Sequence, residues 1–384
     1  MSAGDLGKEN IMNFSFHYYG TYCAAREAGL DPDDSWKIAH AAQFVDECSR
    51  TLLKAHKKSN ACPTYHTNEE LFKMNIGRFN SPFPNEIPQV WTSFHFLPGN
   101  FTEDGRYRLP FRNKDFVGDP TSVELFKLTC LPYGHMSGQI VDAAKREYAS
   151  TGNSANKKLC YIGIVMHVLA DTFAHEYFVG TPSEAINETS WVTEFNKSEE
   201  IKPYGFSNIK SCEEKSYYMY SPAFSSTSVG WLGHGRCGTF PDMPDKKYFY
   251  NPSWYPDAVC TKNNPLLHLC AFVQMTNAIK FIIDDASSEP FDYKAELTPE
   301  QYSDPYSLKL MKIFTSDGSE KNQSAVWSQH IFDTYGQSAA EHNVNTLASN
   351  NEFLDDFIDN ADKHRKMVCQ YCSSITSSIS FFDI

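Results

Sequence analysis

The sequence GIVMHVLADTFAHEYFVG, residues 163–180, decides the fold. It is apolar on nearly every side, which is typical of a helix buried in a protein core rather than one at a surface. His167, Asp171 and His175 occur in it at intervals of four residues. Each such interval turns an α-helix by only about 40°, so the three side chains share one face. The stretch therefore predicts a buried helix with two imidazoles and a carboxylate on one side.

A buried carboxylate needs a positive partner, because removing an unpaired charge from water is costly. A metal ion would serve, since His and Asp are ligands of borderline divalent metals. The alternative is a hydrogen-bonded Asp–His pair that only ties helices together. This stretch alone does not separate the two interpretations.

The rest of the chain predicts an all-α, multi-helix fold. Its 384 residues are 41% hydrophobic and 14% aromatic, which is enough for a substantial core. Helical spacing occurs on both sides of residues 181–262, which are rich in Ser, Tyr, Pro and Gly. We therefore expect one helical domain over residues 1–384, with a long irregular insertion at 181–262 that carries site residues.

Charge and cysteine content bear on the setting of the protein. The formal net charge of −13 argues against nucleic-acid or anionic-membrane binding driven by bulk charge. The 11 cysteines are odd in number and scattered, which favours free thiols in a reducing compartment. We see no signal peptide at the start of the sequence and no run that approaches the ~18 apolar residues of a membrane helix. We expect a cytoplasmic protein without a transmembrane segment.

Two candidate ligands precede the central stretch on predicted helices. His17 lies among aromatic residues in a helix expected at about 13–28, which ends at a glycine. Asp46 lies beside the apolar face of a helix expected at about 36–56. Each residue alone also has a structural explanation, as a packed histidine or a solvated helix residue.

Further candidates come from loops. His95 stands between two phenylalanines in WTSFHFLP (91–98), with His66 as a competitor for the same role. His234 and Asp242 belong to WLGHGRCGTFPDMPD (231–245), whose glycines allow tight bends around a ligand. An ordinary cluster of turns is the alternative for that loop.

The order of these residues resembles the trinuclear zinc phosphoesterases, namely bacterial zinc-dependent phospholipase C and the fungal single-strand nucleases. Those families have an early His, an Asp on the next helix, a His after a loop, a central His-x3-Asp and a later His/Asp group. The phrases FHYYGTY, AAQFVDE, FHFLP, HVLADTFAHEYFVG and GHGRCGTFPDMP look closer to an uncharacterised bacterial and fungal family, a domain of unknown function. They cover roughly residues 1–260, and the C-terminal third carries no such phrase.

The resemblance implies a metal-dependent phosphoric ester hydrolase with two or three zinc ions. The implied ligands are His17, Asp46, His95, His167, Asp171, His175, His234 and Asp242. Asp171 would bridge two ions, and Asp46 would also orient the attacking water. In the resembling families an N-terminal tryptophan supplies two further ligands. Residues 1–13 precede the first helix here, so this chain lacks that pair.

The expected reaction is phosphodiesterase or phospholipase C-like hydrolysis of a small-molecule or lipid phosphoester by a metal-activated water. The nitrogen and oxygen ligand set also accepts Mn or Fe, and zinc is preferred by resemblance only. Two other classes fit the same residues. One is a non-catalytic interaction protein with a structural or lost metal site, and the other is a metal oxidase that holds iron.

Overall fold

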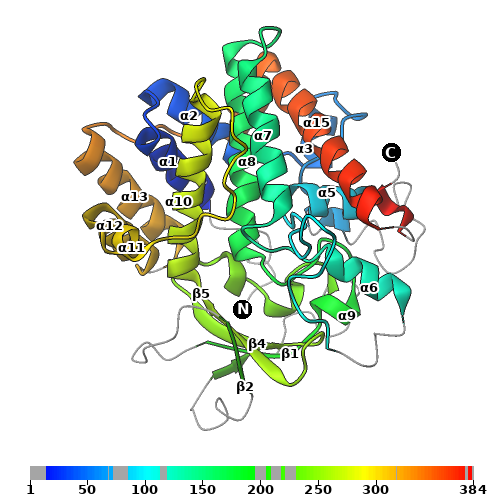
Figure 1. Cartoon of the computed structure of the whole chain (residues 1–384). Helices are drawn as coiled ribbons and strands as arrows, with labels where there is room; N and C mark the ends of the chain where they lie inside the picture. The colour runs from blue at the N-terminus through cyan, green and yellow to red at the C-terminus, as the bar shows by residue number, and fades with distance from the viewer. Residues whose placement is uncertain are drawn as a thin grey trace.

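The structure is a computed structural model. It describes residues 14–67, 69–71, 85–112, 119–194, 205–208, 218–220, 231–316, 318–376 and 379–382. Helices form most of this part of the chain, and a small sheet lies at one end of the helical bundle (Figure 1).

The central element is α8 (Ala155–Ala174), whose first turn is capped by the Ser154 side chain. All of its residues from 159 to 174 are buried, as the apolar sequence predicts. The helix ends at Ala174, so the predicted continuation to residue 180 is wrong. Figure 1 shows α8 in the middle of the bundle. The helices packed around it are α2 (Pro32–Phe44), α7 (His135–Ala149), α10 (Asn264–Ile283) and α15 (Asn351–Ile375).

A glycine allows α2 to approach α8 closely. A Cβ atom at Gly163 would lie 2.4 Å from the carbonyl oxygen of Ile38 and 2.7 Å from the Cβ of Ala41. Both distances are well below van der Waals contact, so the two backbones could not be this close with a larger residue. This contact holds the C-terminal end of α2, and the turn after it, beside the polar face of α8.

The N-terminal helices differ in detail from the prediction. The first consists of a π-helical turn, η1 (Phe16–Gly20), followed by α1 (Thr21–Glu27), and the chain turns at Gly29 with φ of +99°. The second starts at Pro32, after the cap Asp31, and not at residue 36.

The predicted helix at 36–56 is also not continuous. It breaks after Phe44, and α3 (Arg50–Ala55) begins after the Ser49 cap. Asp46 lies in the turn between α2 and α3 and not on a helix face. The Ser49 side chain accepts the amide proton of Leu52, which favours a fresh start over a continuous helix.

Shorter helices complete the bundle. They are α5 (Glu86–Phe94), α6 (Pro120–Lys127), α9 (Glu184–Asn187), α11 (Pro299–Ser303), α12 (Pro305–Phe314), α13 (Glu320–Tyr335) and α14 (Val344–Ser349). Three 3-10 turns are η4 (Gly235–Cys237), η5 (Phe240–Asp242) and η6 (Ser380–Phe382).

The expectation of an all-α fold with an irregular segment at 181–262 needs correction, because this segment forms an antiparallel sheet. The strands are β1 (Thr189–Glu194), β2 (Gly205–Asn208), β3 (Tyr218–Tyr220), β4 (Lys247–Pro252) and β5 (Ala258–Asn263). Their order is β2-β5-β4-β1-β3, with Phe249 opposite Thr261 in the β4–β5 pair. Residues 195–204, 209–217 and 221–230 of the predicted insertion lie outside the described part of the chain.

The composition of the central strands explains both their formation and the missed prediction. β4 contains Tyr248, Phe249 and Tyr250, which are aromatic residues of high strand propensity. Nearly all residues of β4 and β5 are buried, so neither strand shows the alternation that marks a strand with one wet face.

α10 bears on the expectation that no segment has the composition of a membrane helix. By length and hydropathy alone it is apolar enough to cross a membrane, and 72% of its most apolar window is buried inside the protein. A core helix of a soluble bundle has the same properties, so α10 does not establish a membrane span. The ten cysteines in the described part of the chain are free thiols, as expected.

Candidate metal centre

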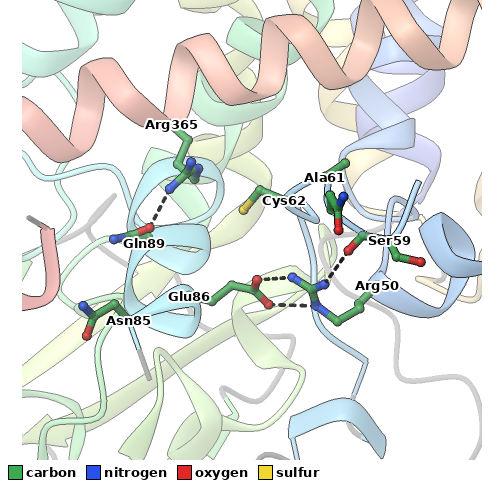
Figure 2. Close-up of a pocket in the computed structure, with 9 residues that line it drawn as sticks. Arg50, Ser59, Ala61, Cys62, Asn85, Glu86, Gln89 and Arg365 are labelled. Carbon is green, nitrogen blue, oxygen red and sulfur yellow. Dashed lines mark hydrogen bonds and ion pairs between the residues drawn. The ribbon is translucent and has the colours of Figure 1, made fainter. Parts of the chain in front are cut away.

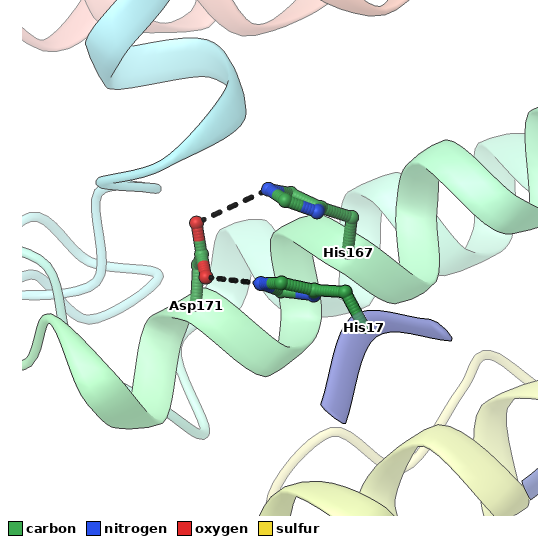
Figure 3. Close-up of side chains that lie close together, drawn as sticks. All are labelled: His17, His167 and Asp171. Carbon is green, nitrogen blue, oxygen red and sulfur yellow. Dashed lines mark ion pairs between the residues drawn. The ribbon is translucent and has the colours of Figure 1, made fainter. Parts of the chain in front are cut away.

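Asp171 lies at the centre of a group of buried imidazoles. Its Oδ1 is 3.2 Å from His17 Nε2, and its Oδ2 is 3.3 Å from His167 Nε2. The two rings stack with centroids 3.9 Å apart, and each faces a different oxygen of the carboxylate (Figure 3). None of these three side chains is accessible to solvent. The carboxylate is therefore shared between two histidines that come from α8 and from the start of the chain.

The π-helical turn positions His17. A π-turn widens the helix by one residue and shifts the side chains that follow it, and such turns are frequent at functional sites. Neither ring nitrogen of His17 has a hydrogen-bond partner among the described residues, although Nε2 lies so close to Asp171. A ring nitrogen near a carboxylate oxygen, without hydrogen-bond geometry, is what two ligands of one ion show.

A second group contains Asp46 and His95. Asp46 Oδ1 lies 3.6 Å from His167 Nε2 and 3.8 Å from His95 Nδ1. His95 follows the last residue of α5, and its Nδ1 is 3.0 Å from Asp171 Oδ2. Two nitrogens, of His95 and His167, thus face two carboxylates, of Asp46 and Asp171.

The outer hydrogen bond of His95 fixes which nitrogen faces the carboxylates. Its Nε2 lies 3.0 Å from the carbonyl oxygen of Thr64, which can only accept, so Nε2 carries the proton. In the neutral ring Nδ1 then holds a lone pair directed at Asp171 and Asp46. This arrangement is stable only when a second proton or a metal ion lies between them. A backbone carbonyl that orients a histidine in this way is a common second layer around protein-bound metals.

A third group lies on the other side of His175, the residue after α8. His175 Nε2 is 3.1 Å from Asp242 Oδ1, and His234 Nε2 is 3.3 Å from the same oxygen. His175 Nδ1 is 3.6 Å from Asp171 Oδ2, which joins this group to the others. Asp242 belongs to η5, and His234 precedes η4 directly after Gly233, whose φ is +55°.

Backbone carbonyls also fix the two rings of the third group. His175 Nδ1 donates to the carbonyl of His95 at 2.7 Å, and His234 Nδ1 donates to that of Gly238 at 2.9 Å. Both Nε2 atoms are therefore unprotonated in the neutral rings and point at Asp242. Phe96 stacks on His175 with ring centroids 4.6 Å apart and holds that ring in place.

The spacing of the donor atoms can be compared with the needs of an ion. Ligands at about 2.0–2.2 Å from a tetrahedral zinc ion lie about 3.3–3.5 Å from one another. Within the three groups, the nitrogen–oxygen distances range from 3.0 to 3.9 Å. The donor set has nitrogen and carboxylate oxygen ligands, which suits Zn, Mn or Fe. The residues therefore fit divalent metal ions in both chemistry and spacing.

Both carboxylates near His17 offer one oxygen to each of two neighbouring groups. Asp46 directs Oδ1 toward His95 and His167, and Oδ2 lies 3.9 Å from His17 Nε2. Neither oxygen of Asp46 has a hydrogen-bond partner among the described residues. Asp171 divides its oxygens in the same way. Two carboxylates that each bridge adjacent positions are suited to a pair of ions.

Burial and neighbouring charge shift the pKa values of these groups. Burial raises the pKa of Asp46 well above its usual value; the charge of His95 opposes this rise, and that of Asp171 adds to it. Burial also acts to raise the pKa of Asp171, but His175 and His167 outweigh it and hold that pKa well below the usual range. Burial, reinforced by His17, lowers the pKa of His167 to about 3. His167 is therefore neutral near pH 7, the form in which histidine binds metal.

The third group shows the opposite balance at its histidine. Burial acts to lower the pKa of His234, but the charge of Asp242 outweighs it and raises that pKa. The pKa of Asp242 is lowered, because His234 and His175 outweigh the effect of burial. Asp242 is therefore ionised near neutral pH and available as a ligand.

His66, the competitor of His95, lies in a different network. Its nitrogens are 3.6 Å from Glu70 Oε2 and 3.4 Å from Glu86 Oε1. Glu86 in turn binds Arg50 with both oxygens, at the hollow shown in Figure 2. The structure therefore places His95 with Asp171 and assigns His66 to an ion-paired cluster at the start of α5.

Sequence reasoning missed the groups that support the candidate ligands. The carbonyls of Thr64 and Gly238 carry no signal in the sequence, because any residue supplies one. Lys262 and Glu176 also escaped notice, although Glu176 directly follows His175. Lys262 Nζ is fully buried, 3.2 Å from Glu176 Oε1, and donates to the Phe173 carbonyl at the end of α8.

All eight predicted ligands come together in these three groups. Seven of the side chains are at most 6% exposed, and His234 is 14% exposed. Their convergence is a finding, whereas metal binding stays a prediction.

Comparisons with known proteins give a family but no function. Residues 12–380 match the model of a family described as "Family of unknown function (DUF6765)". No curated protein and no solved structure matches the chain. The function has to be argued from the arrangement of the site.

Proposed function

The chain belongs to this family of unknown function, DUF6765, and from its site we propose a metal-dependent hydrolase of phosphate esters. The proposed centre holds two or three divalent ions, with zinc preferred. The substrate would be a small-molecule or lipid phosphodiester.

One observation carries this proposal. Three histidines, His95, His175 and His234, donate one N–H to a backbone carbonyl and direct the other nitrogen at a buried carboxylate. A simple Asp–His hydrogen bond needs only one such pair. Three pairs that share Asp171 and Asp242 would bring unprotonated nitrogens and ionised oxygens together without compensation, which is costly in a protein core.

The residues divide into roles by their positions. Asp46, His95, His167 and Asp171 would hold one ion, and His17 would hold a second with the other oxygens of the two aspartates. Asp171 is the bridging ligand. Ions bound there would supply hydroxide at neutral pH and offset charge on the phosphoryl oxygens. Asp46 has two orphan oxygens, so it can bind an ion and also accept a proton from the water.

The third group supports catalysis over a purely structural role. It offers three donor atoms, from His175, His234 and Asp242. Structural zinc sites have four protein ligands, whereas catalytic ones keep a position for water or substrate. His234 is the most exposed of the eight ligands, so solvent reaches this group most readily.

Elemental analysis of protein purified without chelator tests the first half of the proposal. We expect two to three equivalents of metal per chain in the wild type. The matched control is His364→Gln, which alters another buried histidine that donates to a backbone carbonyl, that of Ser93. This variant should keep its metal, whereas His167→Gln should lose it. A wild-type chain that holds no metal after reconstitution would leave the interaction-protein class.

A substrate screen tests the second half. Bis(p-nitrophenyl) phosphate and a short-chain phospholipid serve as phosphodiester probes, with wild type and His364→Gln compared with His167→Gln. We expect hydrolysis that is lost in His167→Gln and after chelation. Bound metal without hydrolysis of any phosphoester would point to a structural centre. Colour and redox-dependent spectra from bound iron would instead favour the oxidase class.

A further inference from the structure

A second cavity adjoins the turn that carries His175, but on the side away from the histidine groups. Its volume is about 190 Å³. The floor is apolar and includes Phe173, Leu267 and Cys270. Three charged residues also line it, namely Arg108, Glu176 and Glu296. None of the eight candidate metal ligands lines this cavity.

The three charged groups do not neutralise one another. In the described part of the chain, no ion pair within 4 Å joins Arg108 to Glu176 or to Glu296. The Arg108 guanidinium uses Nη1 to donate to the carbonyls of Gly99 and Pro132, both at 3.0 Å. Its Nε and Nη2 make no hydrogen bond to any described residue. A cation and two anions thus surround one space with donors and acceptors to spare.

Glu176 is built into the wall of this cavity. It is only 3% exposed, and Lys262 Nζ holds its Oε1 at 3.2 Å. Lys262 also contacts the Tyr177 ring at 5.3 Å from its centroid. One carboxylate oxygen is therefore fixed from behind, and Oε2 is the atom left for a ligand. A buried ion pair that presents an oxygen to a cavity is a prepared acceptor rather than a mobile surface group.

Backbone conformation marks the same place. In the described part of the chain, three residues other than glycine have positive φ, and two of them, Tyr133 (+56°) and Tyr177 (+79°), line this cavity. Such conformations cost energy for residues with a side chain, and they concentrate at functional positions. Here they turn two aromatic side chains toward the same space.

We propose that this cavity binds a small zwitterion, an α-amino acid with a short aliphatic side chain. The carboxylate would pair with Nε and Nη2 of Arg108, which match it as a fork. The ammonium group would lie between Glu176 and Glu296, and the side chain on the Phe173, Leu267 and Cys270 floor. The volume suits this class, since a cavity of about 150 Å³ accepts benzene. The inference is independent of the hydrolase proposal.

Calorimetric titration of the full chain with L-valine tests the proposal. We expect one site with a dissociation constant between about 10 μM and 1 mM, in keeping with a ligand of this size. Isobutylamine lacks the carboxylate and isovalerate lacks the ammonium group, so each should bind at least tenfold more weakly.

Variants locate the binding. Arg108→Gln and Glu296→Gln change exposed side chains, so both should fold and bind L-valine at least tenfold more weakly. Arg106→Gln is the matched control, because Arg106 lies on the same loop, is 80% exposed and pairs with Asp104 away from the cavity. That variant should bind L-valine as the wild type does.

Three results would overturn the proposal. The first is no measurable binding of L-valine at millimolar concentration. The second is equal binding of isobutylamine, which would make the cavity a cation site. The third is binding that Arg108→Gln and Glu296→Gln leave unchanged, which would place the ligand elsewhere.

Discussion

Single hydrogen bonds to backbone carbonyls decide the chemistry of this site. The sequence predicts which residue types meet, because His and Asp recur at helical intervals in an apolar run. It does not predict that Thr64 and Gly238 accept protons from His95 and His234. Those contacts depend on loop positions that only the folded chain defines, yet they select which nitrogen of each ring faces the carboxylates.

Asp171→Asn tests the bridging role directly. Asparagine keeps the shape and one acceptor oxygen but loses the charge and the second anionic oxygen. We expect metal content to fall and phosphodiester hydrolysis to drop at least 100-fold, because even supporting groups around metals are worth 10–100-fold in affinity or activity.

Elemental analysis and the hydrolysis assay measure the effect of Asp171→Asn. Asp33→Asn is the control, since Asp33 is an exposed residue of α2. If Asp171 only accepts hydrogen bonds from neutral histidines, asparagine can still accept them, and metal content is then zero in both proteins.

His364 predicts how stability depends on pH. Burial lowers the pKa of His364 to about 4, although its hydrogen bond to Ser93 opposes the shift. The unfolded chain binds this proton below about pH 6.5, whereas the folded chain binds it only below about pH 4. Stability therefore falls as pH drops from about 6.5 to 4, by about 3 kcal/mol for this group.

Chemical denaturation at pH 7 and pH 4.5 measures the contribution of His364. The variant His364→Gln keeps a donor for the Ser93 carbonyl and removes the titration. Its free energy of unfolding should fall less between the two pH values than that of the wild type. An equal fall in both proteins would show that the buried imidazole does not take part.

Among the elements, helices were easier to predict than strands. The apolar face of α2 and the apolar run of α8 are visible in the sequence, because helical spacing extends over many residues. The break that places Asp46 in a turn depends on a local competition, in which the Ser49 cap starts a new helix. β4 and β5 were missed because burial on both faces removes the alternation that identifies a strand.

The junction of β5 and α8 rests on the pair Lys262–Glu176. Lys262→Met leaves the Glu176 carboxylate buried without its partner, so we expect a loss of about 3–5 kcal/mol in the free energy of unfolding. The double variant Lys262→Met/Glu176→Gln removes both charges and should recover most of this loss. Chemical denaturation of the two variants measures both effects. A double variant as unstable as the single one would assign the loss to packing and not to the unpaired charge.

For the whole molecule, the sequence predicts that distant segments meet, but not how the sheet supports them. The ordered His and Asp residues were recognised through a resemblance to other phosphoesterases, and they do converge. The sheet at the end of the bundle supplies Lys262 beneath the turn at His175, and this support had no counterpart in the prediction.

Ligand linkage predicts that metal stabilises the entire fold. Free zinc at 100 times its dissociation constant should raise the free energy of unfolding by about 2.7 kcal/mol for each site, because the unfolded chain lacks the assembled ligands. Thermal unfolding after chelation, and again after zinc is restored, measures this difference. His364→Gln should respond as the wild type does, and His167→Gln should respond little. An unchanged melting temperature in the wild type would contradict metal binding.

The spread of the eight ligands along the chain has a consequence for synthesis in the cell. His17 is among the first residues to leave the ribosome, and Asp242 follows after nearly two-thirds of the chain has been made. At about 5–20 residues per second, this interval lasts roughly 10–45 s. During that time a nascent chain offers only part of the ligand set. Loading of the centre therefore has to follow translation of β4 and β5, which makes metal delivery a late step in the maturation of this protein.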